Sequence, residues 1–212
     1  ERLRASLVVA KDEVRGDPPL VIKVGGSLAK AGRLDEVLAK IGAARIPIVV
    51  VPGGGPFADA VRDLQKVLQF DDEIAHRLAL LAMEQMAEYI ASRQSGMKVA
   101  RSLDEISDAV IDGQIPVWAP LQMIGEDQSV CASWDVTSDA LSARLAELMG
   151  ARLLILKSAS DCRNVDADEL AAKGIVDNAF PEIVSRAGLS WSIFGPEDDA
   201  DLLAVLAGEG SA

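Results

Sequence analysis

The sequence predicts an α/β fold: a three-layer αβα sandwich with a mainly parallel central sheet. Residues 20–24 and 46–51 are short runs that are almost wholly apolar, as is typical of strands buried on both faces of a parallel sheet. Each run ends in glycines, and each is followed by apolar residues at helical spacing. Strand, glycine turn and helix therefore occur twice before residue 70, which predicts that both glycine turns lie at the same edge of the sheet.

The length and composition fit one large folding unit. With 212 residues, half of them hydrophobic, the chain can bury a substantial core. We expect a single domain over residues 20–212, preceded by an N-terminal extension or edge strand at 1–19. No apolar stretch approaches the roughly 20 residues of a membrane span, so no membrane partner is expected. The formal net charge of −12 argues against nucleic-acid binding.

The small numbers of cysteines and histidines limit which metal sites and disulfide bonds the chain can form. Cys131 and Cys162 lie far apart without a CxxC motif, and His76 is the single histidine, so no zinc site is predicted. His76 itself is expected to be a packing residue. The two distant cysteines favour a reducing compartment, by default the cytoplasm, and no signal peptide is recognised at the start of the sequence.

The remaining elements follow from apolar periodicity. A long helix is predicted at 71–92, opened by Asp71 and Asp72, whose carboxylates suit a helix N-terminus. Its apolar residues are spread widely around the helix, which we interpret as internal packing plus the interface of a homo-oligomer, a dimer or larger. Burial within one chain would leave the same pattern. The other predicted helices cover 34–41, 57–68, 103–111, 138–149, 168–172, 181–187 and 197–206, and the other strands cover 97–100, 115–118, 153–156 and 191–194.

Two lysines and two glycine turns point to phosphate binding. Lys23 projects from a buried strand, where a lysine is costly without an anion, and Gly25 and Gly26 leave backbone N–H groups open to a phosphate. Lys157 directly follows the strand at 153–156 and is placed much as Lys23 is. Ligands of parallel sheets bind at this edge, so two lysines there fit a polyphosphate. Alternatively, Lys23 is a lysine at the edge of a strand, and Gly25 and Gly26 form an ordinary turn that binds no phosphate.

Four motifs in this order resemble those of the amino acid kinase family, and the resemblance covers nearly the whole chain, from Leu20 to Leu206. It implies the αβα fold of that family and transfer of a phosphoryl group from ATP to a phosphate or carboxylate. The acceptor lobe would cover about 20–130 and the nucleotide lobe about 131–212. The motifs are Lys23-Val24-Gly25-Gly26-Ser27, Val51-Pro52-Gly53-Gly54-Gly55, Thr137-Ser138-Asp139-Ala140 and Leu156-Lys157.

The resemblance also implies roles for individual residues. Lys23, Asp139 and Lys157 would be the catalytic residues. Lys23 would bind the moving phosphoryl group, Lys157 would be the lysine on the nucleotide side, and Asp139 would hold the two lysines by ion pairing, although it is also a plausible first-turn residue of its helix. Mg²⁺ would be carried by the ATP phosphates rather than by protein ligands. The acceptor's phosphate would lie at a helix N-terminus, on Gly53, Gly54 and Gly55. Nucleotide-binding residues would be Gly25, Gly26, Ser27, Lys157, Ser158, Asp161 and Lys173, the last as the alternative to Lys157 for the second lysine.

Within the family, three segments look most like the branch that phosphorylates [5-(aminomethyl)furan-3-yl]methyl phosphate in methanofuran biosynthesis. That acceptor carries a phosphate, an ammonium and a flat furan. Arg62 is expected to meet the phosphate, Asp59 the ammonium and Trp134 the ring. Alternatively, Asp59 and Arg62 form an exposed helix pair and Trp134 is a core residue. The three segments are 53–62, Ala75-His76 and 133–139.

Other functions remain open at this point. Cys162 stands where many members have glycine, which puts nucleotide choice in doubt, and Arg163 is a candidate to compensate by reaching a phosphate. Uridylate kinase, or another kinase of the family, is the main competitor. Two non-catalytic functions also remain open. One is a protein that binds ATP and stores an anion, as the molybdenum storage proteins of this fold do. The other is a structural subunit of a mixed oligomer.

Overall fold

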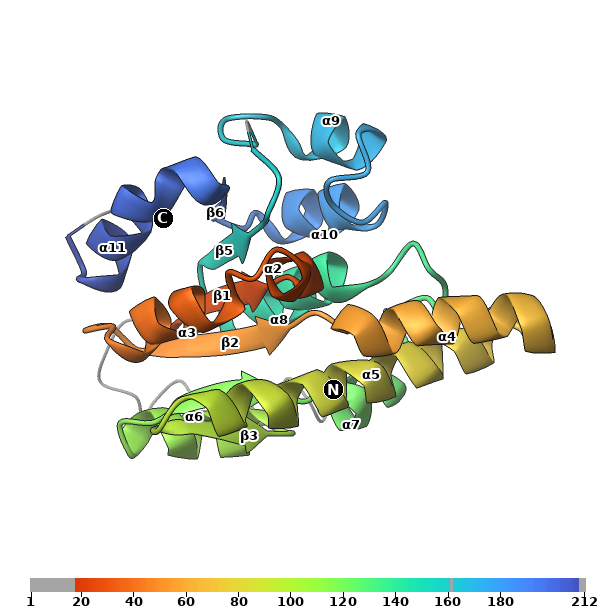
Figure 1. Cartoon of the computed structure of the whole chain (residues 1–212), viewed down its shortest axis with the longest axis horizontal. Helices are drawn as coiled ribbons and strands as arrows, with labels where there is room; N and C mark the ends of the chain where they lie inside the picture. The colour runs from red at the N-terminus through yellow and green to blue at the C-terminus, as the bar shows by residue number, and fades with distance from the viewer. Residues whose placement is uncertain (1–17, 161, 210–212) are drawn as a thin grey trace.

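A computed structural model describes residues 18–160 and 162–209 of the protein. The expected N-terminal extension lies almost entirely outside these residues. The described sheet has six strands, all parallel, in the order β3-β4-β2-β1-β5-β6. The αβα fold class is therefore confirmed (Figure 1). The strands are β1 (Leu20–Val24), β2 (Ile48–Pro52), β3 (Met97–Ala100), β4 (Ile115–Trp118), β5 (Leu153–Leu156) and β6 (Trp191–Phe194).

Every predicted helix is present, with ends within two residues of the prediction. Two short helices, α2 and α7, were not predicted, because each follows glycine or proline and has only five residues. The last predicted helix begins with a short 3₁₀ turn, η1 (Pro196–Asp198). The helices are α2 (Gly26–Lys30), α3 (Leu34–Gly42), α4 (Gly55–Leu68), α5 (Asp72–Arg93), α6 (Leu103–Ile111), α7 (Leu121–Gly125), α8 (Ser138–Met149), α9 (Ala167–Ala172), α10 (Phe180–Ala187) and α11 (Asp199–Leu206).

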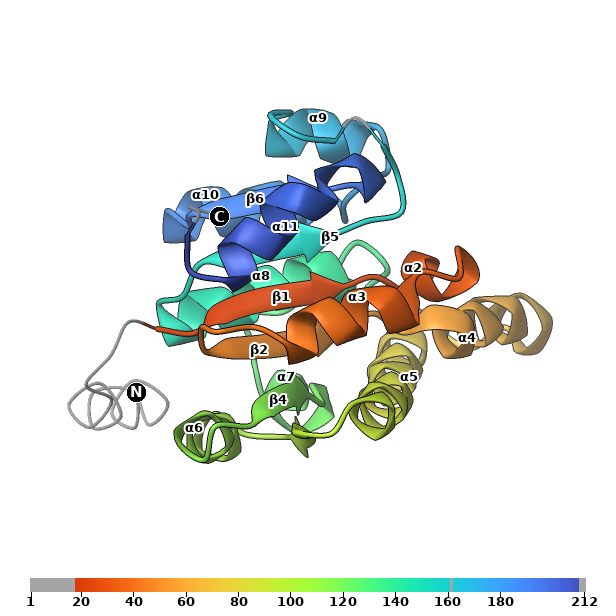
Figure 2. The same cartoon turned by 60° about the vertical axis from the view of Figure 1, so that its left-hand side comes forward.

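Helices cover both faces of the sheet because successive strand residues point to opposite faces. Val21 of β1 belongs to a core with α6, α8 and α10, whereas Ile22 belongs to a second core with α3 and α11. Figure 2 shows α3 and α11 on one side of the central strands and α8 on the other. Both strand residues are fully buried, which explains why the sequence shows continuous apolar runs rather than alternation.

Contacts within the chain explain why the apolar residues of α5 are spread widely around the helix. Leu80 and Met83 pack into the first core, and Met86 and Ile90 pack into the second, so α5 passes from one core to the other. Asp71 caps this helix by accepting a hydrogen bond from the backbone N–H of Ile74 at 2.9 Å. Within the described residues, no helix, α5 included, is both long and apolar enough to cross a membrane.

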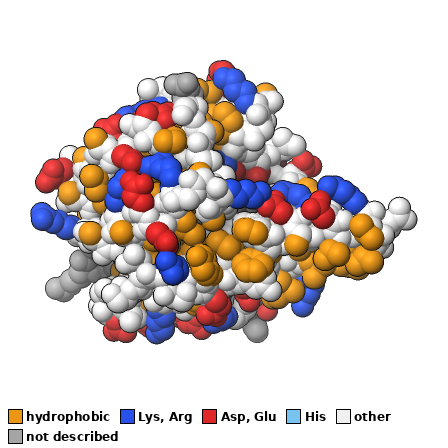
Figure 3. All heavy atoms as spheres, in the orientation of Figure 1, with side chains coloured by type: hydrophobic (Ala, Val, Ile, Leu, Met, Phe, Trp, Pro, Cys, Tyr) orange, Lys and Arg blue, Asp and Glu red, His pale blue; other side chains and the backbone are white. Residues whose placement is uncertain are grey.

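Helix α4 packs along α5 and projects from the sheet (Figure 1). Although its sequence is amphipathic, none of its described residues is buried. Hydrophobic side chains gather on the surface over α4 and α5 (Figure 3). The exposed large hydrophobic side chains there are Phe57, Leu64, Val67 and Leu68 on α4 and Ile74, Leu81 and Tyr89 on α5.

The topology fixes where a ligand can bind. From β1 the chain continues to β2 on one side, and it returns much later to place β5 on the other side of β1. Such a reversal leaves a crevice beyond the carboxyl ends of the strands. Lys23, the glycine turns after β1 and β2, and Lys157 all lie at this edge.

Candidate functional site

A buried carboxylate joins the two predicted lysines. Asp139, in the first turn of α8, is only 3% exposed. One of its carboxylate oxygens lies 2.8 Å from the Lys23 Nζ, and the other lies 2.7 Å from the Lys157 Nζ. Lys23 thus comes from the central strand β1, Lys157 directly follows the neighbouring strand β5, and Asp139 lies at the start of α8. The structure brings together the three residues for which the sequence suggested a catalytic role.

The cluster is charged and asymmetric. Burial alone would raise the pKa of the Asp139 carboxyl, but the charges of Lys23 and Lys157 together hold this pKa below its ordinary value. Burial lowers the pKa of Lys157, the charge of Lys23 lowers it further, and Asp139 acts in the opposite direction. Two cations and one anion leave an excess positive charge, which stabilises a phosphoryl group placed beside the lysines.

The two glycine turns touch each other. A Cβ atom on Gly26 would lie 2.5 Å from the Gly55 Cα, and one on Gly53 would lie 2.8 Å from the Gly26 nitrogen. A Cβ on Gly25 would lie 3.2 Å from the Lys23 Nζ. Gly55 also has a φ of +54°, which favours glycine. The absence of side chains therefore lets both turns approach the lysine cluster.

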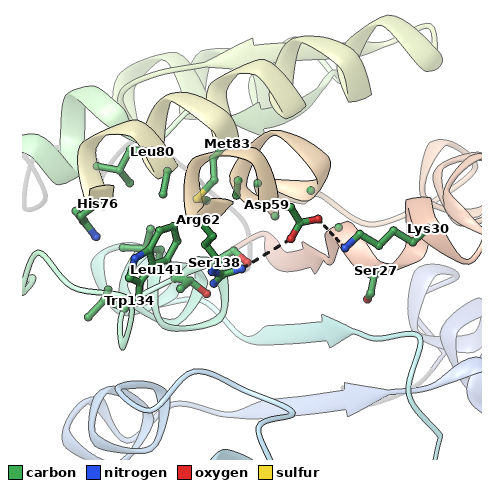
Figure 4. Close-up of a pocket in the computed structure, with 18 residues that line it drawn as sticks. Ser27, Lys30, Asp59, Arg62, His76, Leu80, Met83, Trp134, Ser138 and Leu141 are labelled. Carbon is green, nitrogen blue, oxygen red and sulfur yellow. Dashed lines mark ion pairs between the residues drawn. The ribbon is translucent and has the colours of Figure 1, made fainter. Parts of the chain in front are cut away.

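Next to these turns lies a cavity of about 260 Å³ (Figure 4). Its walls come from α2, α4, α5 and the segment that leads into α8, and they combine backbone, charged and apolar groups. All six residues predicted to bind the acceptor line this cavity. Gly26 and Ser27, which were predicted for the nucleotide, line it too. The acceptor residues are Gly53, Gly54, Gly55, Asp59, Arg62 and Trp134.

The charged side chains of the cavity are linked to one another. Asp59 lies 2.6 Å from the Lys30 Nζ and 4.0 Å from an Arg62 guanidinium nitrogen (Figure 4). The Arg62 guanidinium carbon lies 4.3 Å from the centre of the Trp134 ring, and the Trp134 ring N–H donates to the Gln65 side-chain oxygen at 2.7 Å. Trp134 is half-buried at the cavity wall and is not a core residue.

Three further residues of this region were not predicted to belong to the site. Lys30 lies one turn beyond the first glycine turn, a spacing that could have revealed it. His76 is buried at the cavity wall, and burial lowers the pKa of its ring despite a hydrogen bond to the Ser133 backbone. Asp177 hydrogen-bonds to the start of α8 from a distant segment. No sequence motif marks Asp177.

The predicted nucleotide residues are less closely grouped. Ser158 follows Lys157 at the edge of the sheet, whereas Asp161 lies outside the described residues. Lys173 is about half exposed at the end of α9 and pairs with Glu169, so the contacts described for it do not join it to the lysine cluster. A role for Lys173 stays a prediction.

The loop after β5 is closed by local packing. Cys162 is fully buried, and its thiol lies within hydrogen-bonding distance of the Ala159 and Ser160 carbonyl oxygens, at 3.5 and 3.4 Å. Asn164 has a φ of +61°, so this loop places a left-handed residue two positions beyond Cys162. Arg163 is paired with two acids of the same region, Asp198 and Asp201, rather than aimed at the lysine cluster.

Comparisons with known proteins bear on the family and the fold of the chain. The chain matches the profile of the amino acid kinase family over residues 18–162. It is 24% identical to the [5-(aminomethyl)furan-3-yl]methyl phosphate kinase of Methanocaldococcus jannaschii over 202 residues, which cover 89% of this chain and 93% of that protein.

Solved structures with a similar fold include two kinases of uridylate. The uridylate kinase of Archaeoglobus fulgidus has a TM-score of 0.65 at 16% identity and covers 90% of this chain and 96% of its own. The UMP kinase of Bacillus anthracis has a TM-score of 0.66 at 16% identity, with 92% and 94% covered. A carbamate kinase from Giardia lamblia bound to AMP-PNP has a TM-score of 0.56 at 11% identity, with 91% and 97% covered.

Proposed function

The chain belongs to the amino acid kinase family and is a kinase, and from this premise we propose that it transfers a phosphoryl group from ATP to a small acceptor that already bears a phosphate. The acceptor that we propose is [5-(aminomethyl)furan-3-yl]methyl phosphate, which would become the diphosphate in methanofuran biosynthesis. The observation that carries the proposal is the Lys23–Asp139–Lys157 cluster beside a cavity with two cations, one acid and an aromatic wall.

The lysine cluster and the glycine turns supply what phosphoryl transfer needs. An oxygen of the acceptor's phosphate attacks the γ-phosphorus of ATP, the bond to the ADP oxygen breaks, and ADP leaves. The attacking oxygen is already ionised at neutral pH, so no general base is required. Lys23 and Lys157 neutralise the negative charge of the transferred group, and backbone N–H groups of the glycine turns orient the two phosphates.

Magnesium would enter with the nucleotide. Among the described residues, no group of three or more His, Cys, Asp and Glu side chains is arranged to hold a metal ion. Mg²⁺ on the ATP phosphates would neutralise part of their charge. The excess positive charge of the lysine cluster is suited to the remaining negative charge of that complex.

The cavity suits each part of the proposed acceptor. Arg62 and Lys30 are cations near the glycine turn at the start of α4, where the acceptor's phosphate would lie. Trp134, Leu80 and Met83 provide apolar surface for a single aromatic ring. Asp59 is the acid available to an ammonium in this wall, and the ammonium would compete for it with Lys30.

Uridylate is the second candidate acceptor, because two similar solved structures are kinases of uridylate and a pyrimidine is also a flat ring. The test is release of ADP from ATP and Mg²⁺ with four acceptors: the aminomethylfuran phosphate, UMP, carbamate and acetylglutamate. Turnover with the furan phosphate alone supports the proposal. Turnover with another acceptor overturns the substrate, and no turnover with any of the four favours the storage or structural role.

The exposed apolar side chains of α4 and α5 support a further part of the proposal, a homodimer. Phe57 and Leu68 lie at equal distances along α4 from the midpoint between Arg62 and Asp63, and so do Val61 and Leu64. Two antiparallel copies of α4 would therefore match apolar residues with apolar residues. The proposed interface is therefore formed mainly by α4, whereas the sequence predicted an interface formed by α5. A cytoplasmic location also belongs to the proposal and rests on the number and spacing of the cysteines.

A further inference from the structure

Asp177 lies in the segment between α9 and α10, and its carboxylate is bonded to the start of α8. One oxygen accepts hydrogen bonds from the backbone N–H groups of Thr137, Asp139 and Ala140, at 3.0, 2.9 and 2.9 Å. The other oxygen accepts a hydrogen bond from the Thr137 hydroxyl. The two segments are 37 to 40 residues apart in the sequence. The start of α8 is therefore held by a side chain from elsewhere in the fold.

This contact replaces the usual helix cap. Thr137 is the N-cap residue of α8, a residue type that normally caps with its own hydroxyl, yet it makes no side-chain cap bond. Its hydroxyl instead donates to Asp177. A carboxylate at a helix N-terminus also interacts favourably with the helix dipole. The conformation of the first turn of α8 thus depends on Asp177.

That first turn carries Asp139, so Asp177 and the lysine cluster are connected through a single residue. Asp177 binds the backbone N–H of Asp139, while the Asp139 carboxylate binds Lys23 and Lys157. A shift of the backbone here would move the carboxylate relative to both lysines. Errors of about 1 Å in such alignments are costly in catalysis.

The same segment holds the acceptor wall. Asn178, next to Asp177, donates to the Asp135 carboxylate at 2.7 Å, and the backbone N–H of Ala179 donates to the Asp135 carbonyl oxygen at 3.0 Å. Asp135 directly follows Trp134, which lines the cavity. Three consecutive residues therefore fix the lysine cluster and the aromatic wall relative to one another.

Asp177 also acts on the cluster through its charge. Burial lowers the pKa of Lys157, and the charge of Lys23 on β1 lowers it further. Asp139 on α8 and Asp177 oppose this effect and favour protonated Lys157. Burial and the charge of Asp139 raise the pKa of Asp177 itself, whereas the hydrogen bonds from Thr137 and Ala140 and the charge of Lys23 oppose this rise.

We propose that Asp177 is a positioning residue of the phosphoryl-transfer centre, which aims the Asp139 carboxylate at both lysines. Asp177 acts through Asp139, because its hydrogen bonds go to the start of α8. The proposal rests on the proposed function, because the centre that Asp177 positions is the one assigned there.

The test is Asp177→Asn, which keeps the size of the side chain and removes its charge. We expect kcat to fall on the order of tenfold or more, since charge-assisted hydrogen bonds are lost. KM for ATP and for the acceptor should change less than kcat. The basic limb of the plot of kcat against pH should move to lower pH. Ser102→Ala is the matched control, because it removes the cap of α6, far from the site. It should lower Tm without changing kcat or the pH profile.

A second measurement does not depend on turnover. The NMR signal of the Lys157 side chain, assigned with Lys157→Arg, should titrate at lower pH in Asp177→Asn than in the unchanged protein. An unchanged titration together with an unchanged kcat pH profile overturns the proposal. If the titration moves but no acceptor is phosphorylated by the unchanged protein, the positioning role stands and the proposed function fails.

Discussion

Gly26 and Gly55 pack backbone against backbone, so closely that a Cβ on Gly26 would lie 2.5 Å from the Gly55 Cα. We expect Gly26→Ala to separate the two turns, to lower the free energy of unfolding by about 1–3 kcal/mol, as overpacking does, and to lower kcat strongly. Urea unfolding and ADP release check this prediction. Gly125→Ala is the control, because a Cβ there meets open space. Equal effects of both substitutions would contradict the importance of the contact.

Lys23→Met removes a charge that acts on the transferred phosphoryl group while keeping a long side chain. We expect kcat to fall about 10²- to 10³-fold, the loss typical of one group that stabilises transition-state charge. Circular dichroism should show that the fold survives. Lys98→Met, which changes an exposed lysine on the edge strand β3, should leave kcat unchanged. Normal turnover of Lys23→Met would exclude the phosphoryl role.

The Asp139 carboxyl has a lowered pKa in the folded protein, so its contribution to stability depends on pH. Between the ordinary value of 3.8 and the lower folded value, the unfolded chain binds more protons, and the contribution of Asp139 is lost as pH falls. We expect Asp139→Asn to be less stable than the unchanged protein at neutral pH, with a difference that narrows below about pH 4. Urea unfolding from pH 3 to pH 7 measures it. A difference that is constant across this range would argue against the ion pairs.

Asp59→Asn tests the proposed recognition of the ammonium. The affinity for an acceptor with an amine should fall about tenfold or more, whereas an analogue without the amine should be affected little, because only the amine needs the charge. Values of KM for the two acceptors give the comparison. Asp63→Asn, on the same helix but paired with Lys66 at the surface, is the matched control. Equal losses for both acceptors would leave Asp59 as a partner of Lys30 alone.

Leu64→Asp tests the proposed dimer. Leu64 is half exposed in the middle of α4, and a charge there would face apolar side chains in the interface. Sedimentation velocity should show a dimer for the unchanged protein and a monomer for the variant. Ile111→Asp, at an exposed apolar residue on α6, should stay dimeric. If the unchanged protein is a monomer, the proposed dimer is wrong.

Most of the fold could be predicted because buried parallel strands and amphipathic helices have clear apolar patterns. The helices α2 and α7 could not, since five residues give too little periodicity. The apolar residues of α5 were ambiguous for a physical reason: a helix that passes between two cores resembles one that packs against a partner chain. The apolar spacing of α4 predicted a helix, but it did not show that the described residues of this helix all remain exposed or half-buried.

The site could be predicted in part. Lys23, the glycine turns and Lys157 follow strands, and the parallel sheet brings strand ends together. Asp177 could not be predicted, because the contact between it and the start of α8 is made by the tertiary structure rather than by any sequence spacing. The ion pair between Lys30 and Asp59 likewise joins two helices whose relative placement the sequence does not specify.

The contact between the glycine turns has a mechanical consequence. Gly55 begins α4, which carries the acceptor wall, and Gly26 begins α2, which follows the strand that carries Lys23. Neither turn has a side chain that could yield between them, so a displacement of α4 by an incoming acceptor is transmitted directly to the backbone beside Lys23. Occupancy of one substrate site should therefore change the affinity of the other. This coupling is reciprocal, so each substrate would change the affinity for the other by the same factor.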